Sequence, residues 1–314
     1  MPLIKGGLLL TVIVVIYQKL NQDSILAWAL VKAWSELSTG KFGILMFSLS
    51  MLSCLNWGLE AKKWQVLSRK IEILTFSQAL SGILSGLSLA FITPHAWGDY
   101  LGRIWQLKVS NRFEAFGAVL LGRVSQYLIT VLFGLLGIYF MWVNHFSTFG
   151  YKLWLGLFGM IVLTAILSFF LWKKDKHFKS FIELMAKKWA WKYLKVITNY
   201  SLNDLNQVLL LSGLRYITFS GQFLLLLHFM DIPLNSWVLF AGITWIFLAK
   251  STLPSFNFLS DLGIREFSAI LFFEFYGVDL HQIVVASLTL WLINIVAPTV
   301  IGASLLLRMR LYNN

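Results

Sequence analysis

Cysteine and charged residues are scarce in this sequence, and its histidines lack the spacing of metal ligands. Its single cysteine, Cys54, excludes a disulfide framework and a thiolate metal cluster. The five histidines show no HExxH or similar ligand spacing, and the chain has no GxxxxGK(S/T) motif for nucleotide phosphates. Only 13% of the residues are charged, which is low for a water-soluble domain. We therefore expect no metal, no cofactor and no ATP-driven chemistry.

Hydrophobic residues, in contrast, make up 58% of the 314 positions. Apolar stretches of about 17 to 25 residues are long enough to cross the hydrocarbon core of a bilayer. Several of them end in Trp or Tyr, as is typical of an interfacial belt. We predict an all-α, polytopic integral membrane protein with about six full spans, at roughly 3–17 (short), 42–59, 115–143, 153–172, 205–229 and 283–307.

Two further apolar stretches, 76–107 and 236–278, are interrupted by proline, glycine and charged residues. Broken helices are tolerated at membrane depth only where protein or a water-filled cavity covers the freed backbone. We predict two re-entrant hairpins, and pairs of short spans are the alternative. The order of the spans makes the hairpins enter from opposite faces, so that one domain, 1–314, would contain two inverted halves, 1–172 and 173–314.

The basic residues indicate an orientation. The net charge of +12 would suggest nucleic acid in a soluble protein, but in a membrane protein its location matters more than its sum. Lys5, the loops 60–75, 95–112 and 173–199 and the C-terminus together carry most of the 26 Lys and Arg residues. We therefore expect a multi-pass protein of the cell (inner) membrane with a cytoplasmic C-terminus.

The first interrupted stretch combines a helix break with polar residues. Proline lacks a backbone N–H and disfavours helix in the residue before it, so we place the break at Thr93 and Pro94, with Gly98 close by. If 95–107 is helical, three polar residues recur at i, i+4 and i+8, so that the second and third can form an ion pair: His95, Asp99 and Arg103.

The second interrupted stretch repeats these features in the same order. A break is expected at Pro254, and Asp261 and Arg265 stand four residues apart with Gly263 between them and Glu266 next to the arginine. Corresponding interrupted segments in two halves indicate a transporter whose site lies between the repeats. Clusters of this composition also mark ordinary loops, so the pattern alone leaves both interpretations open.

Basic residues inside the predicted spans complete the candidate site. Such residues usually mark a pathway or ligand site, although Arg123 could instead snorkel and the others could form structural ion pairs with Asp204, Asp261 or Glu266. Arginine matches phosphate with a planar fork of donors. We predict that five residues bind the phosphate of a lipid: Arg103, Arg123, Arg215, Lys250 and Arg265. Four others are candidates for proton coupling or ion pairing: His95, Asp99, Asp261 and Glu266.

These residues resemble the pattern of the membrane domain of lysylphosphatidylglycerol synthases, a flippase-like family. The resemblance extends from about residue 6 to 307 and rests on two motifs and a helix: Thr93-Pro94 with Gly98 and Arg103, the Arg123 helix, and Gly263-Ile264-Arg265-Glu266 followed by Gly277-Val278. It implies a lipid-handling module, since the related domain is credited with moving aminoacylated phosphatidylglycerol between leaflets, and some relatives are associated with sugar transfer from polyprenyl-phosphate carriers.

The chain departs from the family pattern in two ways. It stops at Asn314 without the soluble aminoacyl-transfer domain of the synthases, so aminoacylation is not expected. Many relatives carry a Glu before the arginine of the 115–143 helix and an Asp three residues after it, whereas this chain has Gly122 and Gln126 there.

Three functions follow from these observations. The leading hypothesis is transport, by flipping, of a phospholipid or a polyprenyl-phosphate-linked precursor, with anionic or phosphate-bearing membrane lipids as partners and no nucleic acid. A membrane-embedded glycosyl or headgroup transferase is the second, with Asp99 or Glu266 as general base. A non-catalytic partner of an envelope-synthesis enzyme is the third.

Overall fold

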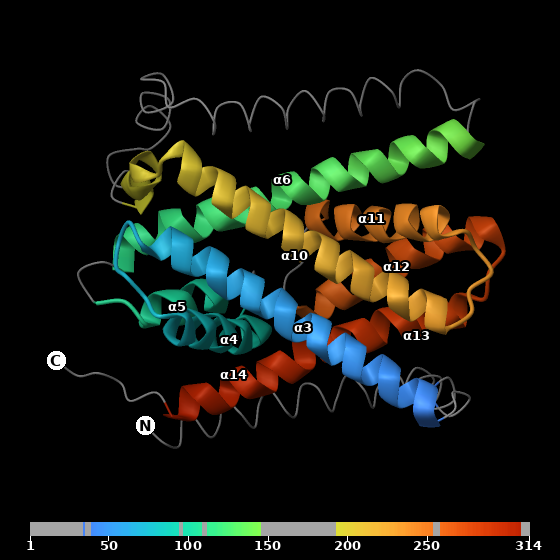
Figure 1. Ribbon diagram of the computed structural model, residues 1–314, viewed down its shortest axis with the longest axis horizontal. Coiled ribbons are helices and arrows are strands. Elements are labelled where there is room, and N and C mark those ends of the chain that lie inside the picture. The colour runs from blue at the N-terminus through green and yellow to red at the C-terminus, as the bar shows by residue number, and fades with distance from the viewer. Residues whose placement is uncertain are drawn as a thin grey trace.

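The computed structural model describes residue 34 and residues 39–93, 97–108, 112–145, 193–253 and 258–308 (Figure 1). In these ranges every regular element is helical and no strand occurs. The helices follow one another as α3 (Thr39–Ser68), α4 (Phe76–Ile92), α5 (Trp97–Trp105), α6 (Arg112–His145), η3 (Lys195–Asn199), α10 (Leu202–Phe229), α11 (Ser236–Thr252), α12 (Phe258–Phe273), η4 (Glu274–Tyr276), α13 (Leu280–Trp291), η5 (Leu292–Val296) and α14 (Ala297–Arg308).

Within the described ranges, four helical segments are long and apolar enough to cross a membrane. They are Gly40–Ser68, Arg112–Phe140, Leu202–Phe229 and Leu280–Leu306, the last of which joins α13, η5 and α14. The prediction of an all-helical membrane protein is confirmed, and these segments match four of the six predicted spans. The predicted spans 3–17 and 153–172 lie outside the described residues.

The first of these segments is longer than predicted. The sequence suggested a span at 42–59 followed by a loop from 60, but α3 continues to Ser68. The drop in hydropathy at Glu60 predicts the end of the span there. In the structure, however, the side chains of Glu60 and Lys63 are buried. They are accommodated because they pair with each other, while Trp64 on the same helix lies in the hydrophobic core. The prediction of a loop was therefore wrong for 60–68.

Each interrupted stretch forms two helices that pack against one another. Helix α4 begins at a capping box between Thr75 and Gln78 and ends at its C-cap, Thr93. The hydroxyl of Thr93 accepts a hydrogen bond from the backbone N–H of Gly98 at 2.8 Å, which joins the end of α4 to the start of α5. In the second stretch α11 ends at its C-cap Leu253 and α12 follows from 258. Pro94, His95 and Pro254 lie outside the described residues.

Glycine permits the close approach of α4 and α5. A Cβ on Gly98 would overlap the backbone of Leu89, and a Cβ on Gly102 would overlap the backbone of Gly86. Small residues at such contacts are typical of helix packing in membranes. Gly98 thus lies next to the predicted break and also allows α5 to pack closely on α4. Gly263 does not mark a break, because it lies within α12, where an added Cβ would meet no atom within 4 Å.

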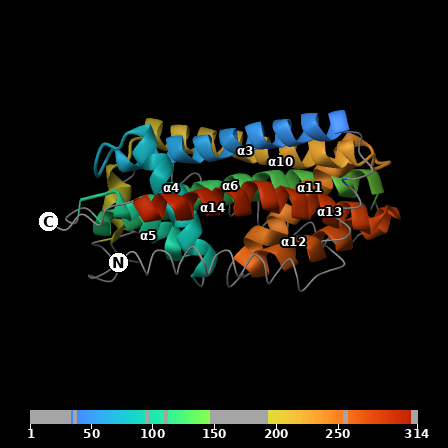
Figure 2. The ribbon, with the colours of Figure 1, turned by 90° about the horizontal axis from the view of Figure 1, so that it is seen from below.

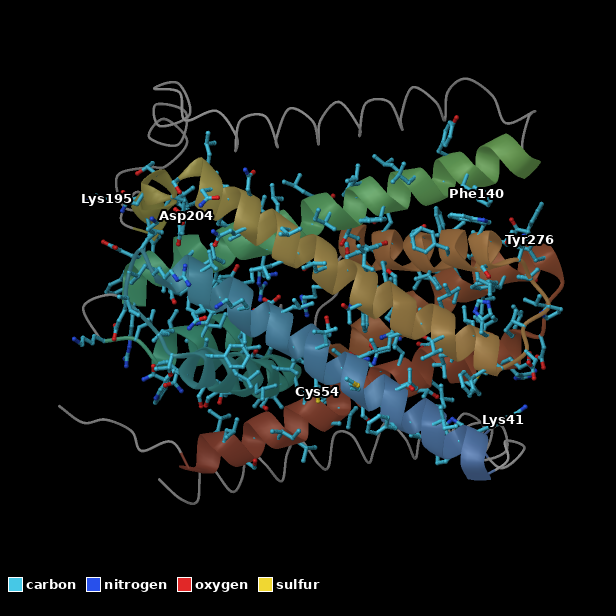
Figure 3. The ribbon with its side chains drawn as sticks, in the orientation of Figure 1. Lys41, Cys54, Phe140, Lys195, Asp204 and Tyr276 are labelled. Carbon is cyan, nitrogen blue, oxygen red and sulfur yellow. The ribbon has the colours of Figure 1, made fainter. Side chains whose placement is uncertain are left out.

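The two helix pairs lie toward opposite ends of the long axis of the bundle (Figure 1). Seen from the side, α3 and α10 run together along one face (Figure 2). One hydrophobic cluster surrounds α4 and α5 and includes Trp64 and Trp291, and a second, rich in phenylalanine, surrounds α11 and α12. Lys195 and Asp204 mark one end of the bundle and Lys41 the other (Figure 3).

Candidate functional site

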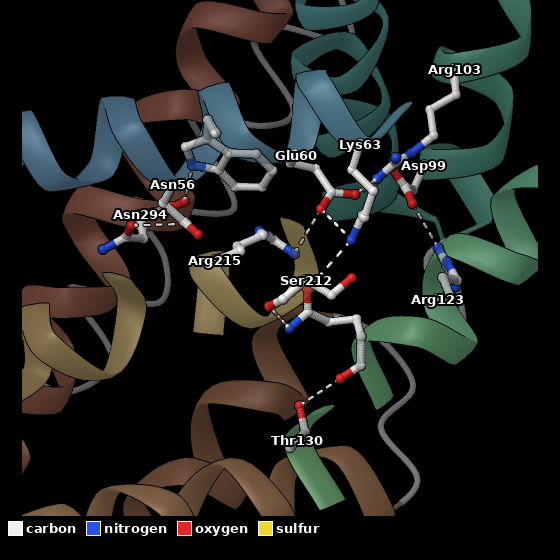
Figure 4. A network of polar contacts seen from close by, with 12 residues as sticks. Asn56, Glu60, Lys63, Asp99, Arg103, Arg123, Thr130, Ser212, Arg215 and Asn294 are labelled. Atoms are coloured by element: carbon white, nitrogen blue, oxygen red, sulfur yellow. Dashed lines mark hydrogen bonds and ion pairs between the residues drawn. The ribbon is translucent and has the colours of Figure 1, made fainter. Parts of the chain in front are cut away.

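Six charged side chains from four helices meet in one network between the helices (Figure 4). Two acidic residues bridge four basic ones. The members are Glu60 and Lys63 of α3, Asp99 and Arg103 of α5, Arg123 of α6 and Arg215 of α10.

Asp99 joins α5 to α6. Its Oδ1 accepts a hydrogen bond from Arg103 Nε at 2.8 Å, and its Oδ2 accepts one from Arg123 Nη2 at 2.9 Å. The first of these contacts confirms the predicted i, i+4 pair. The guanidinium of Arg123 also lies over the ring of Tyr100, 4.3 Å from its centroid. Arg123 is thus held from two sides by α5, rather than snorkelling away from it.

Glu60 lies at the centre of the network and contacts three basic groups. Its Oε1 accepts a hydrogen bond from Arg103 Nη2 at 2.9 Å, and its Oε2 lies 2.7 Å from Lys63 Nζ and 3.0 Å from Arg215 Nη1. The sequence offers Asp204, Asp261 or Glu266 as structural partners of the basic residues other than Arg123, but the partner that the structure shows for Arg215 is Glu60 of α3. Asp204 instead caps α10 and pairs with Lys70.

Gln126 of α6 continues the network in neutral form. Its Oε1 accepts a hydrogen bond from Lys63 Nζ at 3.4 Å, and its Nε2 donates one to the backbone carbonyl of Ser212 at 3.3 Å. The amide therefore links α3, α6 and α10 without adding a negative charge. The network keeps an excess of positive charge as a result.

A pocket of about 550 Å³ opens beside this network. Four of the five predicted phosphate-binding residues line it: Arg103, Arg123, Arg215 and Lys250. Lys63 brings the basic lining residues to five, against Glu60 and Asp99 as the acidic ones. Aromatic side chains supply part of its apolar wall, among them Tyr127, Tyr216, Phe219 and Phe247. Its volume lies in the range of ligand pockets, and its charge suits an anion.

Comparison with protein-family models agrees with this architecture. The model described as "Lysylphosphatidylglycerol synthase TM region" matches residues 6–302. The chain belongs to this family. It is therefore a membrane domain related to proteins of lipid headgroup synthesis. Comparisons with curated proteins and with solved structures gave no match.

In this member of the synthase membrane-region family, Arg265 lies apart from the other four basic residues. Its side chain is fully buried, and its Nη2 donates to the backbone carbonyl and the hydroxyl of Ser287 on α13, at 2.6 and 3.0 Å. The Ser287 hydroxyl in turn donates to Glu266 Oε1 at 3.4 Å. Arg265 and Glu266 are not among the residues that line the pocket. The side chain of Asp261, like His95, lies outside the described residues.

Sequence reasoning missed the part of the site that α3 supplies. Asn56, Glu60 and Lys63 recur at i, i+4 and i+7, the spacing of one helix face, and all three line the pocket. Asn294, within the π-helical turn η5, also lines the pocket and lies next to Asn56. The spacing on α3 was the available signal, but it lay across the boundary that hydropathy assigned between a span and a loop.

Proposed function

We propose that this chain moves a phosphate-bearing lipid, either a phospholipid or a polyprenyl-phosphate-linked precursor, between the leaflets of the inner membrane. The phosphate binds in the pocket beside the network of six charged residues, and the lipid tails remain in the bilayer. The observation that carries the proposal is the excess of basic over acidic side chains in one pocket bounded by helices of spanning length.

The arginines of the network suit a phosphate ligand. Planar guanidinium groups bind phosphate oxygens through two parallel hydrogen bonds, and such charge-assisted bonds are stronger than neutral ones. The side chains of Arg123 and Arg215 keep 38% and 23% of their surface exposed, so both can present donors to the pocket. Glu60 and Asp99 fix the arginines in place before the ligand arrives, which reduces the entropy lost on binding.

The two interrupted helix pairs supply a route for alternating access. Asp99 stands in the first turn of α5, and Lys250 and Ser251 in the last turn of α11, and all three line the same pocket. In our proposal α4–α5 and α11–α12 are re-entrant hairpins that approach this pocket from opposite faces. Inverted-repeat transporters place their site between such discontinuous helices.

The orientation follows from the charged end of the bundle. Among the described residues, the end where α3 stops and α6 begins carries Lys62, Arg69, Lys70, Lys108, Arg112 and Lys195, while the opposite end carries Lys41. The first end is tied together by Tyr200, which donates to the Leu67 carbonyl at 2.6 Å and whose pKa is raised by burial. An excess of basic residues favours the cytoplasmic side, so this end faces the cytoplasm in our proposal.

The transferase hypothesis gains less support. A general base needs a carboxylate that can take a proton from the substrate. The carboxylate of Asp99 is engaged by two arginines and that of Glu60 by three basic groups, and these ion pairs oppose protonation. Glu266 lies outside the pocket. Both acidic residues of the pocket are better placed to position arginines than to move protons.

Leaflet exchange of fluorescent phospholipids and of a fluorescent polyprenyl-phosphate lipid in proteoliposomes tests the proposal. We expect exchange by the native chain and at least a tenfold slower rate for Arg123→Gln. Arg112→Gln, the same substitution on the same helix but outside the pocket, is the control and is expected to keep the native rate. Absence of exchange by the native chain with every phosphate lipid would refute the proposal.

A further inference from the structure

The last spanning segment is interrupted at the level of the pocket. Helices α13 and α14 are joined by the π-helical turn η5, after which the N–H of Ala297 donates to the carbonyl of Leu292, five residues before it. Asn294 and Ile295 of this turn line the pocket. Single π-helical turns inside α-helices occur often at functional sites. Binding of a phosphate by arginines needs no such turn, so it calls for a separate explanation.

Pro298 accounts for the interruption. Proline has no backbone N–H, so Pro298 cannot donate to the carbonyl of Asn294, four residues before it, or to that of Ile293, five residues before it. Helix α3 supplies both missing donors. Trp57 Nε1 donates to the carbonyl of Asn294 at 3.0 Å, and the hydroxyl of Ser53 donates to that of Ile293 at 3.2 Å. The turn is therefore supported by side chains of another helix.

The two sides of the turn are tied to different helix pairs. On one side α14 packs on α4, because a Cβ on Gly302 would overlap the backbone of α4 and the hydroxyl of Ser88 donates to the carbonyl of Thr299 at 2.5 Å. On the other side Arg265 of α12 donates to the carbonyl and the hydroxyl of Ser287 on α13. Figure 2 shows α14 beside α4 and α5, and α13 beside α12. The turn thus lies between two attached halves.

Trp57 connects this turn to the phosphate site. Its indole N–H donates to the turn, and its ring lies under the guanidinium of Arg215, which is 5.3 Å from the ring centroid. Both residues line the pocket, and 23% of the Arg215 side chain is exposed, so a ligand can reach it. The face of an indole ring attracts a cation. A ligand that draws Arg215 into the pocket therefore alters a contact that supports the turn.

Resting on the proposed transport, we infer that η5 is a hinge that makes the two helix pairs move together. Binding of the phosphate at Arg215 acts on the turn through Trp57, and bending of the turn changes the angle between α13 and α14. Prolines and π-helical turns are common sites of such bending. Arg265 is a positioning residue, since it transmits the bend from α13 to α12 and does not touch the lipid.

Distances between spin labels test whether the two pairs move together. The full chain carries Cys54→Ser and either Leu101→Cys with Leu210→Cys, which reports on α5 against α10, or Phe267→Cys with Leu210→Cys, which reports on α12. All three labelled positions are exposed. Maltoside micelles contain no phosphate, and phosphatidylmethanol and a polyprenyl methyl phosphate are the probes, so the one that binds identifies the lipid source. We expect it to shift both distances by about 2 Å or more.

Pro298→Ala supplies an N–H to the carbonyl of Asn294 and should stiffen the turn. We expect this variant to bind the probe with native affinity, to lose both shifts, and to exchange lipid between leaflets roughly tenfold more slowly, within the usual range of coupling energies. The control is Pro233→Ala, at an exposed proline between α10 and α11 outside the pocket, which should keep both shifts.

Arg265→Gln tests the tie between α13 and α12. In its folded fraction we expect native affinity for the probe and a native shift at α5, but no shift at α12. A merely structural defect would not be confined to one helix pair. Where neither this variant nor Pro298→Ala folds, the two distances in the native chain decide.

Binding without a shift, a shift of only one helix pair in the native chain, or native shifts in Pro298→Ala would each overturn the hinge. Both shifts kept, or both lost, in Arg265→Gln would overturn the role of Arg265. In all these cases, binding that Arg123→Gln abolishes leaves the phosphate-site proposal standing. Absence of binding of both probes would overturn the phosphate site instead.

Discussion

In α5, Asp99 and Arg103 stand one helical turn apart and face Glu60 of α3, so that both join a network of charged groups at a pocket. In α12, Arg265 faces Ser287 of α13 and donates to its carbonyl and hydroxyl, away from that pocket. The two helices carry closely similar motifs, yet one arginine borders a cavity and the other is sealed inside the protein.

The difference comes from the helix that packs opposite each motif. Helix α3 brings a carboxylate and a lysine to α5, while α13 brings a small hydroxyl side chain to α12. The packing within each helix pair differs as well. Helices α4 and α5 touch through glycines, whereas α11 and α12 touch where Gly242 lies against the rings of Phe272 and Phe273. The same spacing of an aspartate and an arginine therefore occurs in two helices, and the partner helix determines what each arginine contacts.

The largest expected effect comes from neutralising Glu60, the carboxylate that three basic side chains of the network share. Glu60→Gln keeps the shape of the side chain but leaves Arg103, Lys63 and Arg215 without their shared carboxylate. Breaking a buried ion pair from one side costs about 3–5 kcal/mol. We expect the free energy of unfolding in detergent micelles to fall by about that amount.

The matched control is Glu114→Gln, which removes a carboxylate from the first turn of α6, outside the pocket. Its loss from a helix N-terminus should cost no more than about 1 kcal/mol. If Glu60→Gln were as mild as this control, the network would not depend on Glu60 and the contrast between the two helix pairs would weaken.

A glycine pair compares the packing of the two motifs directly. Gly102→Ala places a Cβ against the backbone of Gly86 where α5 crosses α4, and such overpacking costs about 1–3 kcal/mol. Gly263→Ala adds a methyl group where no atom lies within 4 Å, and it raises helix propensity in α12. We expect the first to lower the thermal unfolding temperature and the second to raise it.

Two results would contradict this prediction. An unchanged unfolding temperature for Gly102→Ala would mean that α4 and α5 can separate without loss. A lower one for Gly263→Ala would mean that the open side of Gly263 is filled in the membrane, which would make the two helix pairs more alike than the structure shows.

Local features of the fold could be predicted from the sequence, and features that join distant segments could not. Hydropathy located four long helices, proline located the interruption after Thr93, and a spacing of four predicted the contact between Asp99 and Arg103. Each of these depends on residues close together in the chain. The spans at 3–17 and 153–172 and the re-entrant character of the hairpins stay predictions.

The partners across the site were beyond sequence reasoning. Glu60 and Lys63 reduce the apparent hydropathy of α3, so that they look like the start of a loop until the basic residues of α5 and α10 are placed opposite them. Arg265 looked equivalent to Arg103, because nothing near it in sequence shows that Ser287 will lie against it. Which helix faces which motif depends on packing over the whole bundle.

Exchanging each of the two arginines for glutamine separates a binding role from a structural one. Arg103 lines the pocket, so Arg103→Gln should weaken the binding of a phosphate lipid by roughly ten- to a hundredfold, since a charge-assisted hydrogen bond contributes about 1.5–3 kcal/mol. Arg265 is fully buried outside the pocket, so Arg265→Gln should reduce the yield of folded protein but leave the affinity of the folded fraction within about twofold. Titration of size-exclusion-purified protein with phosphatidylmethanol separates the two effects. Equal losses of affinity would mean that both arginines act on the lipid, each in a different state of the proposed transport cycle. The contrast between the two helix pairs would then hold only for the conformation described here.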